Sequence, residues 1–302
     1  MKAVVLKGYG DVDVLAVQDM PEPKVGPGEV KVRVTAASIN PVDLKIRRGD
    51  MKERMQLKFP AILGRDVSGE VIEVGTGVED FEPGDRVMGL VNAGYAETVV
   101  APTEAWAKVP ESLDLKDAAA LPLATLTGVQ LIEEQVQPSK GDTVLITGAL
   151  GAVGRAAVFA AHSRGAKIWV GVRRKQVEEA RKTLKVDGVV ALDDPKDVAK
   201  LPTLDAVADT VGGDAMTAVL ERVKHGGTVG SVVGPTKGAK EKGLVVRAFM
   251  SHPDGRRLAQ IGQSVAKGDL VIPVGKTFPL EKAKEAQKLV ESGGVGKVLL
   301  VN

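Results

Sequence analysis

The sequence predicts an α/β protein of two domains, a small barrel-like β domain followed by a doubly wound parallel sheet. The chain has 302 residues, and at about 150 residues per domain this length suggests two domains. Residues 1–110 read as short strands separated by glycine and proline turns, whereas strands and helices alternate from residue 143 onward. The 35 glycines fit a chain with many tight turns.

The β domain begins with a strand at the N-terminus and continues with runs that have the period of a strand. In residues 30–35, three valines alternate with lysine, arginine and threonine, which is typical of a strand with one face in water. Further strands are predicted at Glu70–Gly75, Arg86–Val91 and Tyr95–Ala101, with a turn at Pro83-Gly84 between the first two.

The second domain is predicted from the alternation that starts at Thr143, and we place its boundary near Leu123. Its predicted strands are Thr143–Thr147, Lys167–Val172, Gly188–Leu192, Leu204–Asp209 and Thr228–Val233. After residue 269 the pattern predicts a helix over Leu280–Ser292, capped by Gly293, and a last strand over Lys297–Val301.

Composition excludes several classes of function. A formal net charge of +2 gives no electrostatic field for nucleic acid or for an anionic membrane surface. The chain has no cysteine, and its 3 histidines are far apart in sequence, so a metalloenzyme is not expected. The longest apolar run, Ala118–Ile132, contains proline and polar residues and fails as a membrane span. The N-terminus lacks the pattern of a secretory signal, so we expect a cytoplasmic protein.

A glycine turn follows the strand at Thr143–Thr147. The helix after it is expected to begin with Gly151, Ala152, Val153 and Gly154. Ala149 replaces the first glycine of the dinucleotide pattern, but Gly151 still allows a pyrophosphate to approach the backbone, and Gly154 allows close packing of helix and strand. The context predicts a dinucleotide site; the alternative is a close-packed turn without a ligand.

Basic residues follow the next strand, where an NAD-binding unit would carry an acidic residue. Arg173, Arg174 and Lys175 come directly after Val172. A guanidinium at this position can hold a 2′-phosphate by two hydrogen bonds, so NADPH is the predicted cofactor. The alternative is a solvated charge triplet at the start of a surface helix.

Motifs in both domains carry a resemblance that covers essentially the whole chain. They are Ser38–Lys45, Gly64–Val71, Glu82–Gly89 and Leu204–Gly213. Together with the glycine turn, they resemble the zinc-free quinone oxidoreductase and alkenal/enone reductase branch of the medium-chain dehydrogenase/reductase superfamily. The resemblance implies a GroES-like β-barrel domain over residues 1–123 and 265–302, and a Rossmann NADPH-binding domain over 124–264.

The sequence departs from the zinc-dependent members of that superfamily. Where those enzymes carry a cysteine and a Gly-His-Glu run, this chain has Asn40 and Gly64-Arg65-Asp66. The implied activity is zinc-independent hydride transfer from NADPH to a quinone, or to the C=C bond of an α,β-unsaturated aldehyde or ketone. The alternatives are an NADPH-binding sensor or structural protein with little turnover, and an enoyl reductase acting on acyl chains.

The resemblance also implies roles for individual residues. Asn40 and Lys45 are the predicted catalytic residues near the nicotinamide, although a helix N-cap and a solvent-facing lysine are the plainer interpretations. A further alternative for Lys45 is contact with a cofactor phosphate. Asp43 and Asp66 are expected to be structural. Lys297 is expected to be solvated, with contact to the cofactor as the alternative. Besides the glycine turn and the two arginines, the predicted cofactor-binding residues are Thr127, Thr210, Val211, Gly212, Val233 and Gly234. A homodimer is expected, with the edge strand Leu244–Phe249 at its interface.

Overall fold

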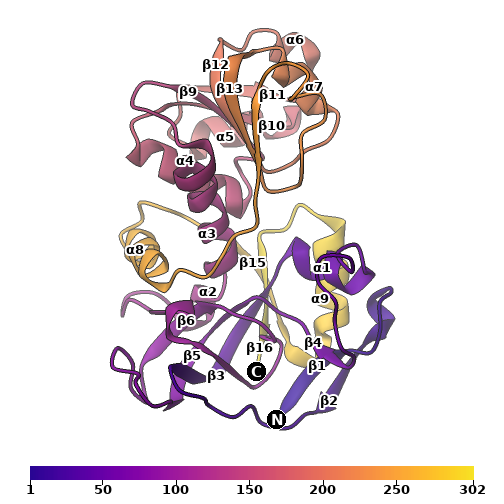
Figure 1. Ribbon diagram of the computed structural model, residues 1–302, viewed down its shortest axis with the longest axis vertical. Helices are drawn as coiled ribbons and strands as arrows, with labels where there is room; N and C mark the ends of the chain where they lie inside the picture. Colours follow the sequence, from indigo (N-terminus) through magenta and orange to yellow (C-terminus); the bar gives the residue numbers. More distant parts are fainter. The chain divides into compact units, whose positions relative to one another are not determined.

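A computed structural model describes residues 1–302 and divides the chain into two compact units (Figure 1). Unit 1 comprises residues 1–123 and 253–302, and unit 2 comprises residues 124–252. The sequence-based boundaries differ from these only in residues 253–264, most of helix α8 (Gly255–Ala266). This helix packs on two strands of unit 1, β6 (Arg86–Leu90) and β8 (Trp106–Lys108). Glycines let it approach closely, because a Cβ on Gly255 would lie 2.0 Å from the carbonyl oxygen of Trp106.

Unit 1 contains two sheets. Its strands are β1 (Lys2–Leu6), β2 (Leu15–Asp19), β3 (Glu29–Ile39), β4 (Ala61–Ile62), β5 (Asp66–Val74), β6, β7 (Thr98–Pro102), β8, β15 (Val274–Pro279) and β16 (Lys297–Val301). One sheet has the order β2-β1-β4, and the other has the order β15-β16-β3-β5-β6-β8, with β7 also paired to β3. Its helices are α1 (Pro41–Arg48), α2 (Leu115–Ala118), α8 and α9 (Ala283–Ser292), with 3₁₀ turns at Val12–Val14, Thr103–Ala105 and Leu280–Lys282.

The valine alternation in β3 builds the core of unit 1. Val30, Val32 and Val34 are buried, while Arg33 between them is exposed, which confirms the predicted strand with one wet face. One edge of this long strand is shared, because β7 pairs with its first half and β16 with its second half. Its end therefore lies beside the start of β16 and, across the other edge, beside the start of β5.

Unit 2 is a doubly wound parallel sheet. Its strands are β9 (Thr143–Thr147), β10 (Lys167–Val172), β11 (Gly188–Ala191), β12 (Leu204–Asp209), β13 (Val223–Ser231) and β14 (Val245–Ala248). Its helices are α3 (Pro122–Gln130), which begins at the end of unit 1, a π-helix (Leu131–Val136), α4 (Ala152–Ser163), a 3₁₀ turn (Arg174–Gln176), α5 (Val177–Thr183), α6 (Pro195–Val198) and α7 (Ala215–Leu220). All five strand pairs are parallel, and the order is β11-β10-β9-β12-β13-β14.

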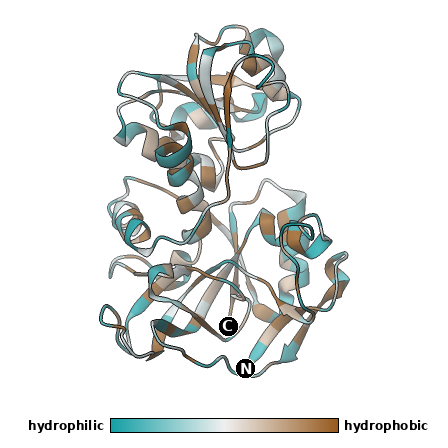
Figure 2. Cartoon of the chain, in the orientation of Figure 1, coloured by the Kyte–Doolittle hydropathy of each residue, from teal (hydrophilic) through white to brown (hydrophobic).

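The order of the strands in unit 2 fixes where a ligand binds in such a sheet. The chain winds outward in one direction from β9 to β11 and in the other from β12 to β14, so the reversal falls between β9 and β12. In open α/β sheets, ligands bind beyond the carboxyl ends of the strands at this reversal. Figure 2 shows hydrophobic residues along these strands, as expected for strands covered on both faces.

Most of the predicted elements are confirmed, some with shifted ends. The strands β9, β10 and β12 have the predicted bounds. The strand predicted at Tyr95–Ala101 starts only at Thr98, because Tyr95 and Ala96 make isolated contacts to residues outside β7. The helix predicted from Leu280 begins as a 3₁₀ turn and becomes α-helical at Ala283. The predicted edge strand is β14.

The apolar run predicted not to span a membrane is divided between short elements. It covers the end of α2, all of α3 and the start of the π-helix. Nowhere in the structure does a helix combine the length and apolar content that a bilayer crossing requires.

Candidate functional site

The glycine turn of unit 2 leaves backbone donors without partners. Strand β9 is followed by Gly148, which has a φ of +64°, and Gly151 is the N-cap of α4. Its own N–H donates to the Gly148 carbonyl (2.9 Å). The next three N–H groups, those of Ala152, Val153 and Gly154, have no acceptor in the protein. Free N–H groups at the positive end of a helix dipole favour an anion.

The two glycines of the turn are needed for different reasons. A Cβ on Gly154 would lie 2.4 Å from the Gly148 carbonyl oxygen, so the protein's own packing excludes a larger residue there. A Cβ on Gly151 would meet only that same oxygen, at 3.3 Å, and otherwise open space. The protein therefore does not require glycine at 151, whereas a ligand lying against the backbone would. The packing role predicted for Gly154 is therefore confirmed, whereas the ligand role of Gly151 stays a prediction.

A buried carboxylate that the sequence analysis missed organises the ends of β9 and β12. Asp209 is almost fully buried, and one of its oxygens accepts hydrogen bonds from the Thr147 hydroxyl (2.9 Å) and from the N–H groups of Val211 (3.1 Å) and Gly212 (2.8 Å). The hydroxyl of Thr210 donates to the Thr147 carbonyl (2.7 Å). The signal in the sequence was an aspartate as the last residue of an apolar strand.

Apolar side chains are exposed where β12 and β13 end. Val211 is 57% exposed and Val233 is 40% exposed. Gly212 and Gly234, which follow them, have φ values of +69° and +117°. These four predicted residues thus come together at the carboxyl edge of the sheet, where exposed valines offer an apolar surface to a ring.

The remaining predicted residue of unit 2, Thr127, lies in α3. Its hydroxyl donates to the hydroxyl of Ser251 (2.9 Å). The next residue, Gly128, packs α3 against the start of α4, since a Cβ there would lie 2.2 Å from the Val153 carbonyl oxygen. Thr127 is therefore on a helix that contacts the glycine-turn helix.

The two predicted arginines have different surroundings. The Arg174 guanidinium forms an ion pair with Asp194, and its backbone N–H donates to Asp193 (2.7 Å). Both aspartates follow β11. The sequence near Arg173 contains no acidic residue, but the pairing of β10 with β11 brings these two aspartates to Arg174. The Arg173 guanidinium is exposed and has no partner in the protein. Only Arg173 thus remains open to an anionic ligand.

Unit 1 contains a buried polar cluster at the end of β3, made of Ser38, Asn40, Asp43, Asp66, Tyr95 and Lys297. Asp66 is fully buried, and its Oδ2 accepts hydrogen bonds from the Ser38 hydroxyl (2.7 Å), the Asn40 amide (2.8 Å) and the Lys297 ammonium (3.2 Å). Its Oδ1 accepts from the backbone N–H of Leu123 (2.6 Å), at the start of α3. Four donors, one of them charged, compensate for the burial of this carboxylate.

The expectation that Lys297 is solvated is wrong. Lys297 is 8% exposed, and its ammonium donates to Asn40 Oδ1 (2.7 Å) and to Asp66. The cause is the position of β16, whose first residue is Lys297 and which pairs with the end of β3. A side-chain hydrogen bond between residues 257 positions apart cannot be read from local sequence.

A second part of the cluster holds a carboxyl group with a shifted pKa. The Oδ2 atom of Asp43 accepts from the backbone N–H of Asn40 (2.8 Å) and from the Tyr95 hydroxyl (2.8 Å), while its buried Oδ1 has no partner. Burial raises the pKa of Asp43 to about 6, against the lowering effect of these two hydrogen bonds. Burial also raises the pKa of the Tyr95 phenol well above its usual value, so this hydroxyl stays protonated.

The two predicted catalytic residues have different surroundings. Asn40 is the N-cap of α1, as the plainer interpretation proposed, and its amide N–H groups donate to the Ser38 carbonyl (3.3 Å) and to Asp66. Its amide oxygen accepts from Lys297, so every polar atom of this side chain has a partner. Lys45 lies further along α1, is partly exposed, and its ammonium has no partner in the protein.

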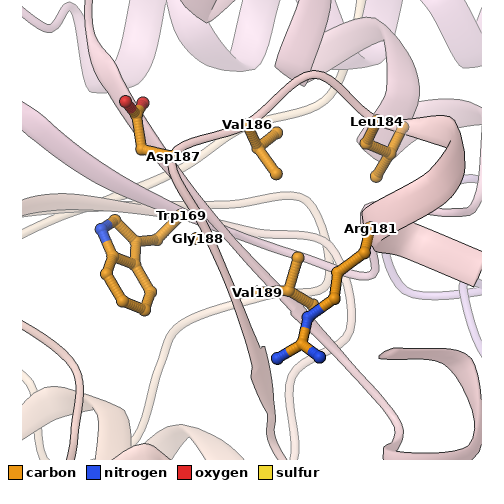
Figure 3. A pocket seen from close by; sticks show the side chains of 7 residues that line it. All are labelled: Trp169, Arg181, Leu184, Val186, Asp187, Gly188 and Val189. Carbon is orange, nitrogen blue, oxygen red and sulfur yellow. The ribbon is translucent and has the colours of Figure 1, made fainter. Parts of the chain in front are cut away.

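One open pocket of about 340 Å³ lies elsewhere on unit 2 (Figure 3). It is lined by Trp169, Arg181, Leu184, Val186, Asp187, Gly188 and Val189. Gly188 is the first residue of β11, so the pocket is near the amino end of that strand and away from the carboxyl edge. It contains none of the predicted site residues.

Comparison with known proteins places both units in known families. The alcohol dehydrogenase GroES-like domain family matches residues 26–111, and the zinc-binding dehydrogenase family matches residues 184–300. The chain is 30% identical to the chloroplast envelope quinone oxidoreductase homolog of Arabidopsis thaliana, over 93% of this chain and 92% of that protein.

Solved structures resemble the whole chain. The quinone oxidoreductase from Coxiella burnetii has a TM-score of 0.89 at 30% identity, covering 100% of this chain and 99% of that one. A structure described as an NAD-dependent alcohol dehydrogenase has a TM-score of 0.87 at 31% identity, with 100% of both chains covered. The relatives therefore include proteins described by quinone reduction and by alcohol oxidation.

Proposed function

The chain belongs to the medium-chain dehydrogenase/reductase superfamily, in its quinone oxidoreductase branch, and from this premise we propose that it is an NADPH-dependent, zinc-independent reductase of quinones and of α,β-unsaturated aldehydes and ketones. Oxidoreductases of this superfamily use a nicotinamide cofactor, which supplies a hydride when it is bound. The choice of NADPH, the independence from zinc and the class of substrate are parts of the proposal.

The observation that carries the proposal is the glycine turn of unit 2. Three unpartnered N–H groups at the start of α4 stand next to Gly151, the one position of the turn where glycine is not required by the protein. We assign the pyrophosphate of the dinucleotide to Ala152, Val153 and Gly154. Thr127, Thr210, Val211, Gly212, Val233 and Gly234 are proposed to line the rest of the cofactor site.

The preference for NADPH is proposed on the free guanidinium at the end of β10. Arg173 has no internal partner, whereas Arg174 is paired with Asp194. A 2′-phosphate accepts two hydrogen bonds from a guanidinium. We therefore assign the phosphate contact to Arg173 and give Arg174 a smaller share, because its charge is already balanced.

The independence from zinc is proposed on the donor set of unit 1. This unit contains neither histidine nor cysteine, the nitrogen and sulfur ligands that zinc prefers. His, Cys, Asp and Glu side chains do not gather in groups of three anywhere in the chain. Arg65 stands where the zinc-dependent enzymes carry the histidine of the Gly-His-Glu run. Asn40 and Asp66, which stand where they carry the cysteine and the glutamate, are bound to the Lys297 ammonium. These residues do not fit a catalytic zinc ion.

In unit 1, Lys45 and Asn40 are proposed to serve the substrate. Lys45 has a free ammonium that can reach an acceptor. Asn40 has no free donor, so we propose that it positions its neighbours rather than binding substrate itself. Reduction of a conjugated carbonyl compound adds one hydride and one proton, and the negative charge that forms on oxygen needs a hydrogen-bond donor.

A turnover screen tests the proposal. The protein is mixed with NADPH or NADH and a series of enals, enones and quinones, and the loss of reduced nicotinamide absorbance is followed. We expect turnover with NADPH and slower turnover with NADH. Equal rates with both nucleotides would remove the phosphate contact from the proposal. Tight NADPH binding without turnover of any substrate would favour a sensor or structural protein.

A further inference from the structure

The ammonium of Lys297 has one donor more than the protein uses. It carries three N–H bonds, and the chain offers it two acceptors, Asn40 Oδ1 at 2.7 Å and Asp66 Oδ2 at 3.2 Å. The residue is more than nine-tenths buried. Because buried donors in folded proteins nearly always find an acceptor in the protein or in an ordered water, the third N–H has room for an oxygen from water or from a ligand.

We propose that Lys297 is a catalytic residue, and that its third N–H binds the carbonyl oxygen of the substrate as that oxygen becomes negatively charged. This inference rests on the proposed function and deepens it. When a hydride forms the new C–H bond at the β carbon of an enone, the carbon–carbon π pair shifts and an electron pair moves onto the oxygen. A proton from water then adds to the α carbon and completes the reduction. In a quinone, the electron pair moves onto one of the two carbonyl oxygens.

The surroundings of Lys297 suit this role better than those of the two other candidates. Asn40 has no donor left, since both of its amide N–H groups are engaged. Lys45 has a free ammonium, but nothing in the protein fixes its direction. Lys297 is held by two acceptors that are themselves buried, so its remaining N–H is oriented before substrate arrives. A donor fixed in advance requires no reorganisation when charge develops.

The charge balance of the cluster supports a hydrogen-bond donor rather than a bare cation. Asp66 neutralises the ammonium and is itself held by Ser38, Asn40 and Leu123. An oxygen that gains negative charge receives a charge-assisted hydrogen bond, which is about twice as strong as a neutral one.

The first test needs no nucleotide and no turnover. The probe is 4-nitrophenol, whose phenolate absorbs at longer wavelength than the phenol and resembles a reduced quinone oxygen. At a fixed pH where the free probe is half ionised, we expect the wild-type protein to raise the phenolate fraction of the bound probe. The K297M variant should lose this increase. The increase should persist in K288M, which replaces an exposed lysine of the same unit.

The double variant D66N/K297M guards against a folding defect, since it removes both charges of the buried pair. If Lys297 is a donor, this variant folds but still fails to raise the phenolate fraction, and its kcat for enone reduction falls by roughly 10²–10³-fold with unchanged NADPH affinity. Full activity in the double variant would overturn the proposal, because Lys297 would then serve only to balance Asp66.

Other outcomes also decide the question. A wild-type protein that leaves the ionisation of the probe unchanged, or fails to bind it, overturns the proposal. Loss of the effect in K45M but not in K297M assigns the donor to Lys45 instead. If the wild type reduces no enone or quinone, the proposed function fails, while the probe still reports whether Lys297 offers a donor.

Discussion

The two polar regions of this molecule treat their hydrogen-bond donors in opposite ways. At the glycine turn of unit 2, three consecutive N–H groups have no partner in the protein. In the cluster of unit 1, Asp66 collects four donors and Asn40 is fully engaged. We propose that the first region binds a ligand that brings its own acceptors. The second region is built to hold one ammonium in place. The difference is the one expected if the first region binds the cofactor and the second stabilises charge, as we propose.

The largest expected effect comes from disrupting the buried polar cluster of unit 1. Asp66→Ala leaves the buried Lys297 ammonium without its counter-ion, and loss of one partner of a buried pair costs about 3–5 kcal/mol. Urea unfolding followed by circular dichroism measures this loss. The control is Asp50→Ala, which removes an exposed ion pair with Arg48 and should change stability by less than about 1 kcal/mol. Equal losses in the two variants would mean that the cluster is not the tightly coupled unit described here.

The next effect distinguishes the roles of Gly151 and Gly154 in the glycine turn of unit 2. Gly154→Ala forces a Cβ against the Gly148 carbonyl and should destabilise the protein by about 1–3 kcal/mol. Gly151→Ala meets almost nothing in the protein, so stability should be nearly unchanged, while NADPH affinity falls by about tenfold through crowding of the ligand. Thermal unfolding measures the change in stability, and nucleotide titration measures the change in NADPH affinity. A Gly151→Ala variant that binds NADPH normally would argue against a pyrophosphate at this turn.

The third effect compares the two arginines. Arg173→Gln should weaken NADPH binding by roughly 10–100-fold, the value of a charge-assisted hydrogen bond, and leave NADH binding almost unchanged. Arg174→Gln should have a smaller effect on NADPH, because Arg174 already pairs with Asp194. Fluorescence titration with both nucleotides provides the measurement. A larger loss of NADPH affinity in Arg174→Gln than in Arg173→Gln would assign the phosphate contact to Arg174.

The fourth effect concerns the pH dependence of stability and the buried polar cluster of unit 1. The pKa of Asp43 rises from 3.8 to about 6 on folding, so the folded protein binds the proton more tightly than the unfolded chain. Stability contributed by this group is fully present below pH 3.8 and is lost as pH rises toward about 6, with a slope of at most about 1.4 kcal/mol per pH unit.

The matched variant is Asp43→Asn. Its amide oxygen can accept from Asn40 and Tyr95, and its NH₂ takes the place of the unpartnered Oδ1. Urea unfolding at several pH values should show a flatter pH dependence and higher stability near neutral pH. An unchanged slope in the variant would assign the pH dependence to other groups.

The sequence predicted the parts of the molecule that depend on local pattern. The valine period of β3 and the bounds of β9, β10 and β12 follow from alternation and turn residues. The glycine turn was predictable because the strand, the turn and the helix start that define it lie within twelve consecutive residues, 143–154. The Cβ distances support the packing role predicted for Gly154, and the ligand role of Gly151 stays a prediction.

Long-range contacts explain what sequence reasoning missed. Lys297 joins Asn40 only because β16 pairs with β3, and Asp194 joins Arg174 only because β11 lies beside β10. Asp209 ends an apolar strand, but its four donors come from the ends of three different strands, β9, β12 and β13. Such partners are fixed by sheet topology, which local periodicity does not determine.

The most direct test of the central claim is to follow the hydride itself. Wild-type protein is incubated with NADPH carrying deuterium at the transferred C4 position and with a simple enone, and the product is analysed by NMR. The account predicts one deuterium on the β carbon and an unlabelled hydrogen from water on the α carbon, with no added zinc. A product without deuterium at the β carbon, or turnover that depends on zinc, would contradict it.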